Sequence, residues 1–161
     1  VSGAFDRVRC ERLIEKLRAK GGCERWLELF ASWLRERPAK VAVNGKFSDD
    51  MVLKNMVYQG TVWGPTLWNV FYEDARQPVK ESGFTEVVHA DDLNAYKELE
   101  KKKTNRTALE EAKLCQTELH TWGRANQVTF DSSKESHHVL CAKEPEGESF
   151  RLLVIPFDCK L

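Results

Sequence analysis

The sequence predicts an α+β fold in which an antiparallel sheet carries helices packed on one face. Three observations predict it. Apolar residues recur at helical spacing over 7–20 and over 24–37. Two segments have hairpin character, 40–58 around Asn44-Gly45 and 84–96 around two adjacent aspartates. Hairpins interleaved with helices are typical of an antiparallel α+β domain.

In the first third of the chain, residues 1–5 favour the end of a strand that runs into a turn, and Asp6 is placed to cap the first helix. Pro38 ends the second helix, because the residue before a proline disfavours helical geometry. Asn44-Gly45 then predicts a tight turn, with a return strand somewhere in 51–58.

The rest of the chain continues the alternation. Pro65 fits the first turn of a helix over 65–80. A capping box at 107–110 predicts a helix that runs to about residue 125. Two strands are expected at 137–142 and 150–157. We therefore expect one domain, or part of one, over residues 1–161.

Composition excludes several classes of protein. The 161 residues are 42% hydrophobic and 31% charged, which is enough for a core and excludes a disordered tail. No apolar run is long enough to cross a bilayer, and no segment resembles a signal peptide. Five scattered cysteines without a CxxC pair predict reduced intracellular thiols. A net charge of zero argues against a polycationic module. The basic cluster at 101–103 is a solvated loop or, alternatively, a phosphate contact.

Asp91 and Asp92 are the most informative polar pair. They lie between two β-favouring runs, 87–89 and 93–96, and should occupy a tight turn. Adjacent carboxylates repel each other, and a divalent cation relieves that repulsion. The alternative is a solvated turn without a ligand. A second pair, Asp49-Asp50, lacks a β frame on both sides and is predicted to be loop.

Three sequence blocks in a fixed order help to decide whether Asp91 and Asp92 bind a cation or form a solvated turn. The sequence Ser2-Gly3-Ala4-Phe5-Asp6 opens the chain, QGTVWGPTLWN occupies residues 59–69, and His89-Ala90-Asp91-Asp92 follows. Together they resemble the palm of reverse transcriptases, most closely the non-LTR (LINE-like) retrotransposon branch, where the middle block reads roughly QGxxLGPxLxN. Residues 122–134 and 150–158 resemble the two blocks that follow. The resemblance covers essentially the whole chain.

The resemblance implies an RNA-directed DNA polymerase, a nucleotidyltransferase that adds dNTPs to a primer 3′-OH. Such chemistry uses two Mg²⁺ ions, for which Mn²⁺ can substitute, to clamp the attacking and leaving oxygens. By resemblance, Asp91 is a metal ligand and Asp92 is its supporting partner. Lys134 would reach the polyphosphate and assist the leaving group, a role suited to a flexible cation. Alternatively, Lys134 is a surface lysine.

The resemblance also assigns the nucleotide pocket. Phe5 would lie under the incoming sugar and exclude a 2′-OH, or else it is a core residue. Gln59 offers a donor and an acceptor to the nucleotide, and Gly60 lets the backbone approach closely. Leu152 and Leu153 would belong to the primer grip. The implied partners are an RNA template, a DNA primer and dNTPs, with no membrane.

A further metal ligand of the family is an Asp five residues before the aromatic of the opening block. Since Phe5 is that aromatic, this position falls immediately before Val1. The sequence therefore resembles a piece of a longer polyprotein, whose fingers, thumb and possible endonuclease lie elsewhere, and whose fingers-proximal helices are at 7–37. The isolated chain is expected to lack polymerase activity. The resemblance implies an intracellular, nuclear protein.

Three residues depart from the family pattern. Tyr58 replaces the usual proline, His89 replaces an aromatic residue and Val154 replaces a glycine. These departures favour an alternative, a catalytically inactive remnant or a nucleic-acid-binding derivative. A metal hydrolase using His89 and the aspartates is a third reading, and it lacks a second motif.

Overall fold

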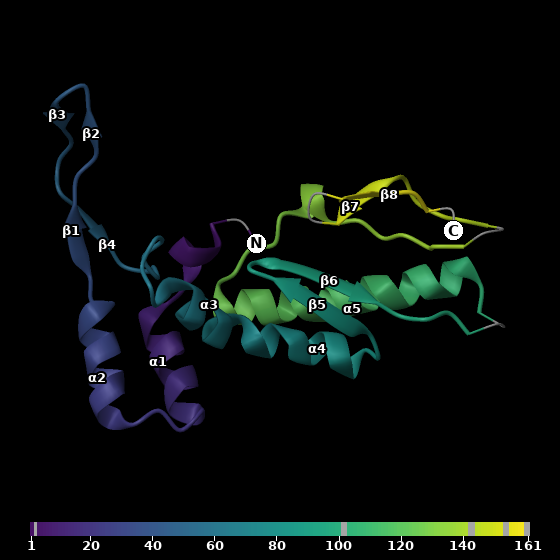
Figure 1. Cartoon of the computed structure of the whole chain (residues 1–161), viewed down its shortest axis with the longest axis horizontal. Coiled ribbons are helices and arrows are strands. Elements are labelled where there is room, and N and C mark those ends of the chain that lie inside the picture. The colour runs from purple at the N-terminus through teal and green to yellow at the C-terminus, as the bar shows by residue number, and fades with distance from the viewer. Residues whose placement is uncertain (2, 101–102, 142–143, 153–154, 160–161) are drawn as a thin grey trace.

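A computed structural model of the protein describes residues 1, 3–100, 103–141, 144–152 and 155–159 (Figure 1). Its helices are α1 (Cys10–Ala19), α2 (Glu24–Trp33), α3 (Gly64–Tyr72), α4 (Arg76–Glu81) and α5 (Asn105–Asn126). Its strands are β1 (Arg37–Ala39), β2 (Ala42–Val43), β3 (Lys46–Phe47), β4 (Met51–Leu53), β5 (Thr85–His89), β6 (Asp92–Tyr96), β7 (Phe150–Leu152) and β8 (Ile155–Phe157). The predicted α+β class is confirmed.

The strands pair differently from the single sheet that we expected. Within the described residues they form four separate antiparallel pairs, β1–β4, β2–β3, β5–β6 and β7–β8. The start of the chain explains part of the difference. The strand end predicted at 1–5 is wrong, because Ala4–Arg7 form a 3-10 turn and supply no strand that could extend the β5–β6 pair.

Two predicted helix caps are also wrong. Helix α1 begins at Cys10 behind Arg9, which makes no side-chain capping bond, so Asp6 caps nothing. Helix α5 begins at Asn105, two residues before the predicted capping box, and its N-cap is Thr104. The hydroxyl of Thr104 accepts a hydrogen bond from the Thr107 backbone N–H at 3.3 Å. Thr107 thus lies inside the helix, and its amide is one of the otherwise unpaired donors that a cap satisfies.

The C-terminal part forms a hairpin where we expected one strand. Strands β7 and β8 pair in antiparallel fashion, with Leu152 opposite Ile155. The strand predicted at 137–142 is absent from the described part of that segment, where Val139 makes a single bridge to Glu146.

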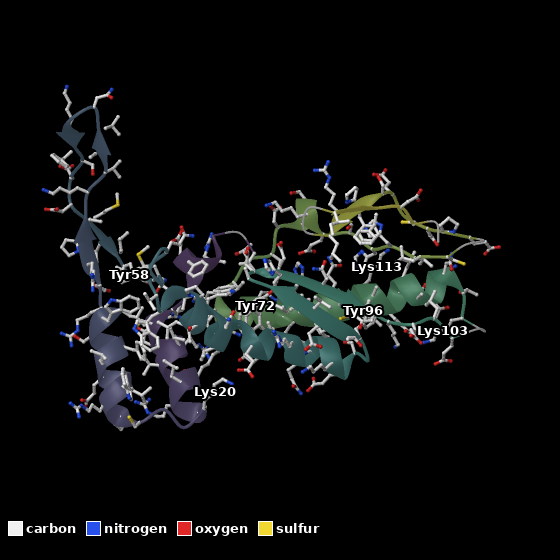
Figure 2. All side chains as sticks on the ribbon, in the orientation of Figure 1. Lys20, Tyr58, Tyr72, Tyr96, Lys103 and Lys113 are labelled. Carbon is white, nitrogen blue, oxygen red and sulfur yellow. The ribbon has the colours of Figure 1, made fainter. Side chains whose placement is uncertain are left out.

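Residues 37–53 form an arm that projects from the end of α2 (Figure 1). The β1–β4 pair is its base and the β2–β3 hairpin its tip, with Asn44-Gly45 at the predicted turn. Its side chains extend into solvent on both sides (Figure 2). Every residue from 40 to 50 is exposed. The arm therefore contributes little to the hydrophobic core.

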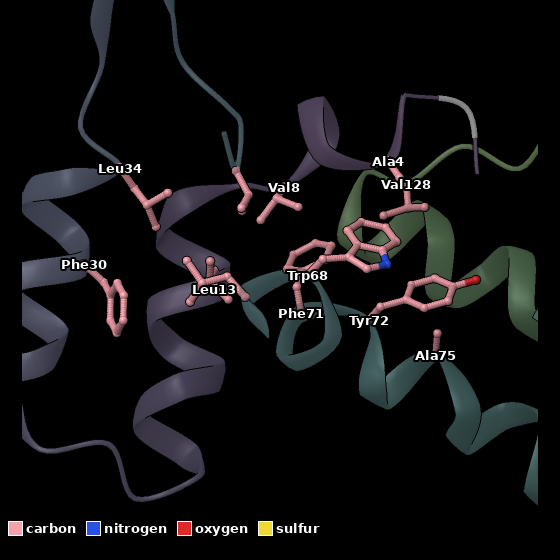
Figure 3. Packing of buried hydrophobic residues seen from close by; sticks show 12 residues of the cluster. Ala4, Val8, Leu13, Phe30, Leu34, Trp68, Phe71, Tyr72, Ala75 and Val128 are labelled. Atoms are coloured by element: carbon pink, nitrogen blue, oxygen red, sulfur yellow. The ribbon is translucent and has the colours of Figure 1, made fainter. Parts of the chain in front are cut away.

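The core joins α1, α2, α3 and the end of α5 (Figure 3). Its largest fully buried side chains are Trp68, Phe71 and Tyr72, all from α3. The Trp68 ring stacks on Tyr72 and is tilted against Phe71. The remaining buried members are Ala4, Val8, Leu13, Phe30, Leu34, Val57, Leu67, Ala75 and Val128. Because α3 is apolar over most of its surface, it can be covered on several sides at once.

A half-buried lysine, Lys16, connects several elements of this core. The Lys16 ammonium group donates to the carbonyl of Phe71 and to Asp74 Oδ1, both at 2.7 Å. It also lies over the Phe71 ring, 4.4 Å from the ring centroid. Trp122 Nε1 donates to the same Asp74 oxygen at 3.0 Å. One carboxylate thus connects α1, α5 and the 3-10 turn between α3 and α4. Among the described helices, none is long and apolar enough to cross a membrane.

Candidate active site

The adjacent aspartates lie at the tip of the β5–β6 hairpin, as predicted. His89 pairs with Asp92, so the two-residue turn consists of Ala90 and Asp91, and Asp92 is the first residue of β6. Ala90 adopts a left-handed backbone with φ of 54°. A positive φ at the first turn residue is required by one of the favoured two-residue hairpin turns. The alternation of β5 turns Val88 toward the core and His89 toward solvent.

Helix α3 supports this turn from below. Trp68 is 1% exposed, and its Nε1 donates to the Ala90 carbonyl at 2.9 Å. The same indole stacks on Tyr72, with 4.9 Å between the ring centroids. The turn carrying Asp91 is therefore fixed to the most buried part of the core.

The Asp91 carboxylate is partly accessible to solvent and lies next to one positively charged group. Its side chain is 37% exposed, and its Oδ2 lies 3.3 Å from the Val1 α-amino group. Among the described residues, no group of three or more His, Cys, Asp or Glu side chains is arranged to hold a metal ion. Two adjacent carboxylates still fit Mg²⁺, which commonly takes one or two carboxylates and completes its shell with water and substrate phosphates.

Phe5 lies beside this platform. Its half-buried ring is 5.8 Å from the Trp68 ring, centroid to centroid. Its carbonyl accepts from the Val57 N–H at 2.9 Å. A Cβ added at Gly64 would lie 3.5 Å from the Phe5 ring, which shows how closely the start of α3 approaches it. The three sequence blocks thus meet around Trp68, which contacts Phe5 on one side and Ala90 on the other.

Gln59 and Gly60 are exposed in the loop that leads into α3. Gly60 has a φ of 76°, a conformation that favours glycine. The Thr61 hydroxyl shapes the loop by donating to the Tyr58 carbonyl at 2.7 Å and accepting from the Gly64 N–H at 3.2 Å. No hydrogen bond within the described residues joins Gln59 or Gly60 to the hairpin.

Lys134 is exposed at the end of a 3-10 turn, Ser132–Lys134. Asp131 shapes this turn by accepting from the N–H of Ser133 at 3.1 Å and from its hydroxyl at 2.6 Å. These bonds hold the pKa of Asp131 below its usual range, with smaller contributions from Lys134 and the Val1 amino group.

The predicted primer grip and the basic cluster at 101–103 lie only partly within the described residues. Leu152 is half-buried in β7, next to a stacked pair of rings, Phe150 and Phe157, 5.5 Å apart. Leu153 lies outside the described residues, as do residues 101 and 102 of the basic cluster. Lys103 of that cluster forms an ion pair with Glu111 at 2.6 Å.

The sequence alone did not indicate Tyr72. It is 2% exposed, and its hydroxyl has no hydrogen-bond partner among the described residues. Burial raises the pKa of Tyr72 well above its ordinary value, and the carboxylates of Asp91 and Asp92 raise it further. The spacing of Trp68 and Tyr72 indicates a shared helix face. It does not indicate that this face lies beneath the hairpin.

A paired-carboxylate turn fixed to a helical platform within an α+β fold is the arrangement expected of a polymerase palm. A family model described as reverse transcriptase (RNA-dependent DNA polymerase) matches residues 1–156. The chain belongs to the reverse transcriptase family, whose activity is RNA-directed DNA synthesis on a nucleic-acid template and primer. The comparison with curated proteins finds no match, and the comparison with solved structures finds none either.

Proposed function

We propose that this chain is the palm portion of the polymerase of a non-LTR (LINE-like) retroelement, acting by two-metal nucleotidyl transfer. One observation carries the proposal. The opening block, the QG block and the aspartate turn are far apart in the sequence, yet Phe5 and Ala90 both contact Trp68. Trp68 itself belongs to the QG block. A chance arrangement of three short motifs has no reason to converge on one buried side chain.

In this proposal Asp91 and Asp92 hold the catalytic Mg²⁺ ions, or Mn²⁺ in their place. When bound, the ions stabilise charge on the reacting phosphate oxygens. The exposed Asp91 carboxylate at the hairpin tip supports this role, because a substrate phosphate can reach a ligand that remains open to solvent. A family metal ligand immediately before Val1 would complete the set, and the Val1 amino group already lies beside Asp91.

The other residues have supporting roles. Phe5 forms the floor beneath the incoming sugar, and Gln59 with Gly60 lines the nucleotide pocket. Lys134, exposed at the end of its 3-10 turn, reaches the polyphosphate. Leu152 and Leu153 belong to the primer grip. The partners are an RNA template, a DNA primer, dNTPs and further domains of a polyprotein that acts in the nucleus, with the helices at 7–37 next to its fingers.

Primer extension tests the proposal. The 161-residue segment is produced within its own longer reading frame and assayed on an RNA template with Mg²⁺. Asp91→Asn should reduce synthesis by at least about 100-fold, because a neutral amide is a poor ligand for a hard cation. Asp50→Asn is the matched control, since that carboxylate is exposed in the arm. Synthesis that survives Asp91→Asn would show that Asp91 holds no catalytic ion.

A second function has a specific observation in its favour. The described residues contain two adjacent carboxylates at the turn but no larger metal-binding group, and His89 stands where the family has an aromatic residue. A catalytically inactive remnant or nucleic-acid-binding derivative would have this set. The residue encoded before Val1 distinguishes the two, because an Asp there favours the polymerase and any other residue favours the remnant.

A further inference from the structure

A buried hydroxyl without a partner lies next to the candidate active site. The Tyr72 ring is fixed by stacking on Trp68 at 4.9 Å and by an edge contact with Trp122 at 5.5 Å. Its hydroxyl is closed off from solvent and has no hydrogen-bond partner among the described residues. Such groups are rare in folded proteins because a buried donor that loses its water must recover a hydrogen bond elsewhere. An explanation is therefore required for this one.

The position of Tyr72 points to the aspartate turn. Tyr72, His89 and Ala90 line one open cleft of about 460 Å³ at the base of the turn. The neighbouring Trp68 already donates to the Ala90 carbonyl at 2.9 Å. Figure 2 shows Tyr72 near the middle of the molecule, whereas Tyr96 lies farther along the hairpin. Tyr72 is thus the tyrosine beneath the turn.

The charges around Tyr72 define what it can do. Burial raises the pKa of Tyr72, and Asp91 and Asp92 contribute in the same direction. A phenol hydroxyl is protonated at neutral pH and can act as a donor. Glu73 is the acidic residue among those that line the cleft, and its carboxylate is already paired with Lys20. The carboxylates at the turn are acceptors with spare capacity, since an ionised carboxylate has about four lone-pair sites.

We propose that Tyr72 is a positioning residue of the carboxylate pair: its hydroxyl donates to the Asp91 carboxylate when that carboxylate holds a divalent cation, and so fixes which oxygen faces the ion. This inference rests on the proposed metal-binding role of Asp91. In the 161-residue chain Asp91 Oδ2 lies 3.3 Å from the Val1 ammonium group. A cation that displaces this ammonium group lets the side chain reorient toward the phenol.

The proposal predicts two opposite effects of Tyr72→Phe. The substitution keeps the ring and its stacking but removes the unpaired hydroxyl, so the metal-free chain should become more stable. The same substitution removes the donor that orients Asp91, so divalent cations should bind more weakly. Loss of a partner that orients a metal ligand commonly lowers metal affinity 10- to 100-fold. A tyrosine with only a packing role would leave metal affinity unchanged.

The experiment measures both effects on the 161-residue chain. Mn²⁺ binding is followed by electron paramagnetic resonance at pH 7, and thermal unfolding is followed by circular dichroism without metal. We expect Tyr72→Phe to raise Tm by about 3 °C and to weaken Mn²⁺ binding about tenfold. Tyr96→Phe is the matched control. It removes a tyrosine hydroxyl from the β5–β6 hairpin, which carries Asp91, at a residue that is 58% exposed. It should change neither quantity.

Asp91→Asn separates the inference from the proposed function. If Mn²⁺ binding depends on Asp91 but is unchanged by Tyr72→Phe, the inference is wrong and the proposed metal ligand stands. If Tyr72→Phe lowers Tm, the hydroxyl has a partner in the metal-free chain, and the inference is also wrong. If Asp91→Asn does not affect Mn²⁺ binding, the metal assignment itself fails and the positioning role fails with it.

Discussion

Asp74 should stabilise the protein more than its exposure suggests. Its side chain is 52% exposed, but its Oδ1 atom accepts from the Lys16 ammonium group at 2.7 Å and from Trp122 Nε1 at 3.0 Å. The Lys16 side chain is only 15% exposed. Burial lowers the pKa of Lys16 even though its hydrogen bond to Asp74 acts in the opposite direction. Asp74→Ala would therefore remove the counter-ion of a largely desolvated cation, which keeps only the Phe71 carbonyl as acceptor, and would leave the Trp122 indole N–H without its acceptor.

The magnitude follows from these contacts. A hydrogen bond to a charged group contributes about 1.5–3 kcal/mol when buried, whereas an exposed ion pair contributes about 0–1 kcal/mol. Half-exposed Asp74 falls between these limits, and the loss of the Trp122 bond adds about 1 kcal/mol. We expect Asp74→Ala to lower the free energy of unfolding by about 2 kcal/mol, equivalent to a fall of about 6 °C in Tm for a chain of this size.

Urea unfolding followed by tryptophan fluorescence measures this loss. Asp50→Ala is the matched control, because Lys40 and Asp50 are 3.5 Å apart with side chains 49% and 69% exposed. It should change stability by less than about 0.5 kcal/mol. Lys16→Met keeps the aliphatic stem and should cost about 1 kcal/mol.

The double variant provides the decisive comparison. If Lys16 and Asp74 interact as described, the effects of Lys16→Met and Asp74→Ala should be non-additive by about 1 kcal/mol. Additivity within about 0.3 kcal/mol, or an Asp74→Ala effect no larger than that of the control, would refute the reasoning.

Three further predictions concern separate parts of the chain. Burial raises the pKa of Cys10, so at pH 8 this thiol should react with a disulfide reagent more slowly than exposed Cys23, as mass spectrometry of the labelled peptides can show. The hydrogen bond from Lys103 holds the pKa of Glu111 below its unfolded value of 4.5, so its stabilising effect is present above pH 4.5 and lost as the pH falls through the folded pKa. The stability difference between the unmodified chain and Glu111→Gln should accordingly shrink between pH 6 and pH 3 in urea titrations. Gly123→Ala would place a Cβ 2.8 Å from an aromatic ring and from a backbone carbonyl, so it should cost about 2 kcal/mol in the same measurement, and an unchanged stability would contradict the close packing of this helix.

Local patterns explain what could be predicted from the sequence. The β5–β6 hairpin was predicted with its aspartates at the tip, because Val87-Val88 and the run from Leu93 form a β frame around turn-favouring residues. Apolar spacing is also a local signal and predicted α1, α2 and α5, but the single helix predicted over 65–80 is divided into α3 and α4 by a 3-10 turn at Glu73–Ala75. Their ends were less predictable. Thr104 and Thr107 are both plausible caps, and their hydroxyls lie 3.0 Å apart in the structure.

Long-range features could not be predicted in this way. The segment 150–157 contains no glycine or asparagine that would mark a turn, so these residue types do not indicate the pairing of β7 with β8. The contact between Trp68 and Ala90 joins residues 22 positions apart. No periodicity within α3 reveals which element covers it. The family resemblance indicated which blocks belong together, but Tyr72 lies outside the residues on which that resemblance depends.

The projecting arm has a practical consequence. Since residues 40–50 are all exposed and none belongs to the core cluster, the arm is a segment whose sequence is decoupled from the stability of the rest. A short peptide epitope or a fluorophore attachment site placed between Asn44 and Gly45 should thus report on the position of the molecule without perturbing the aspartate turn.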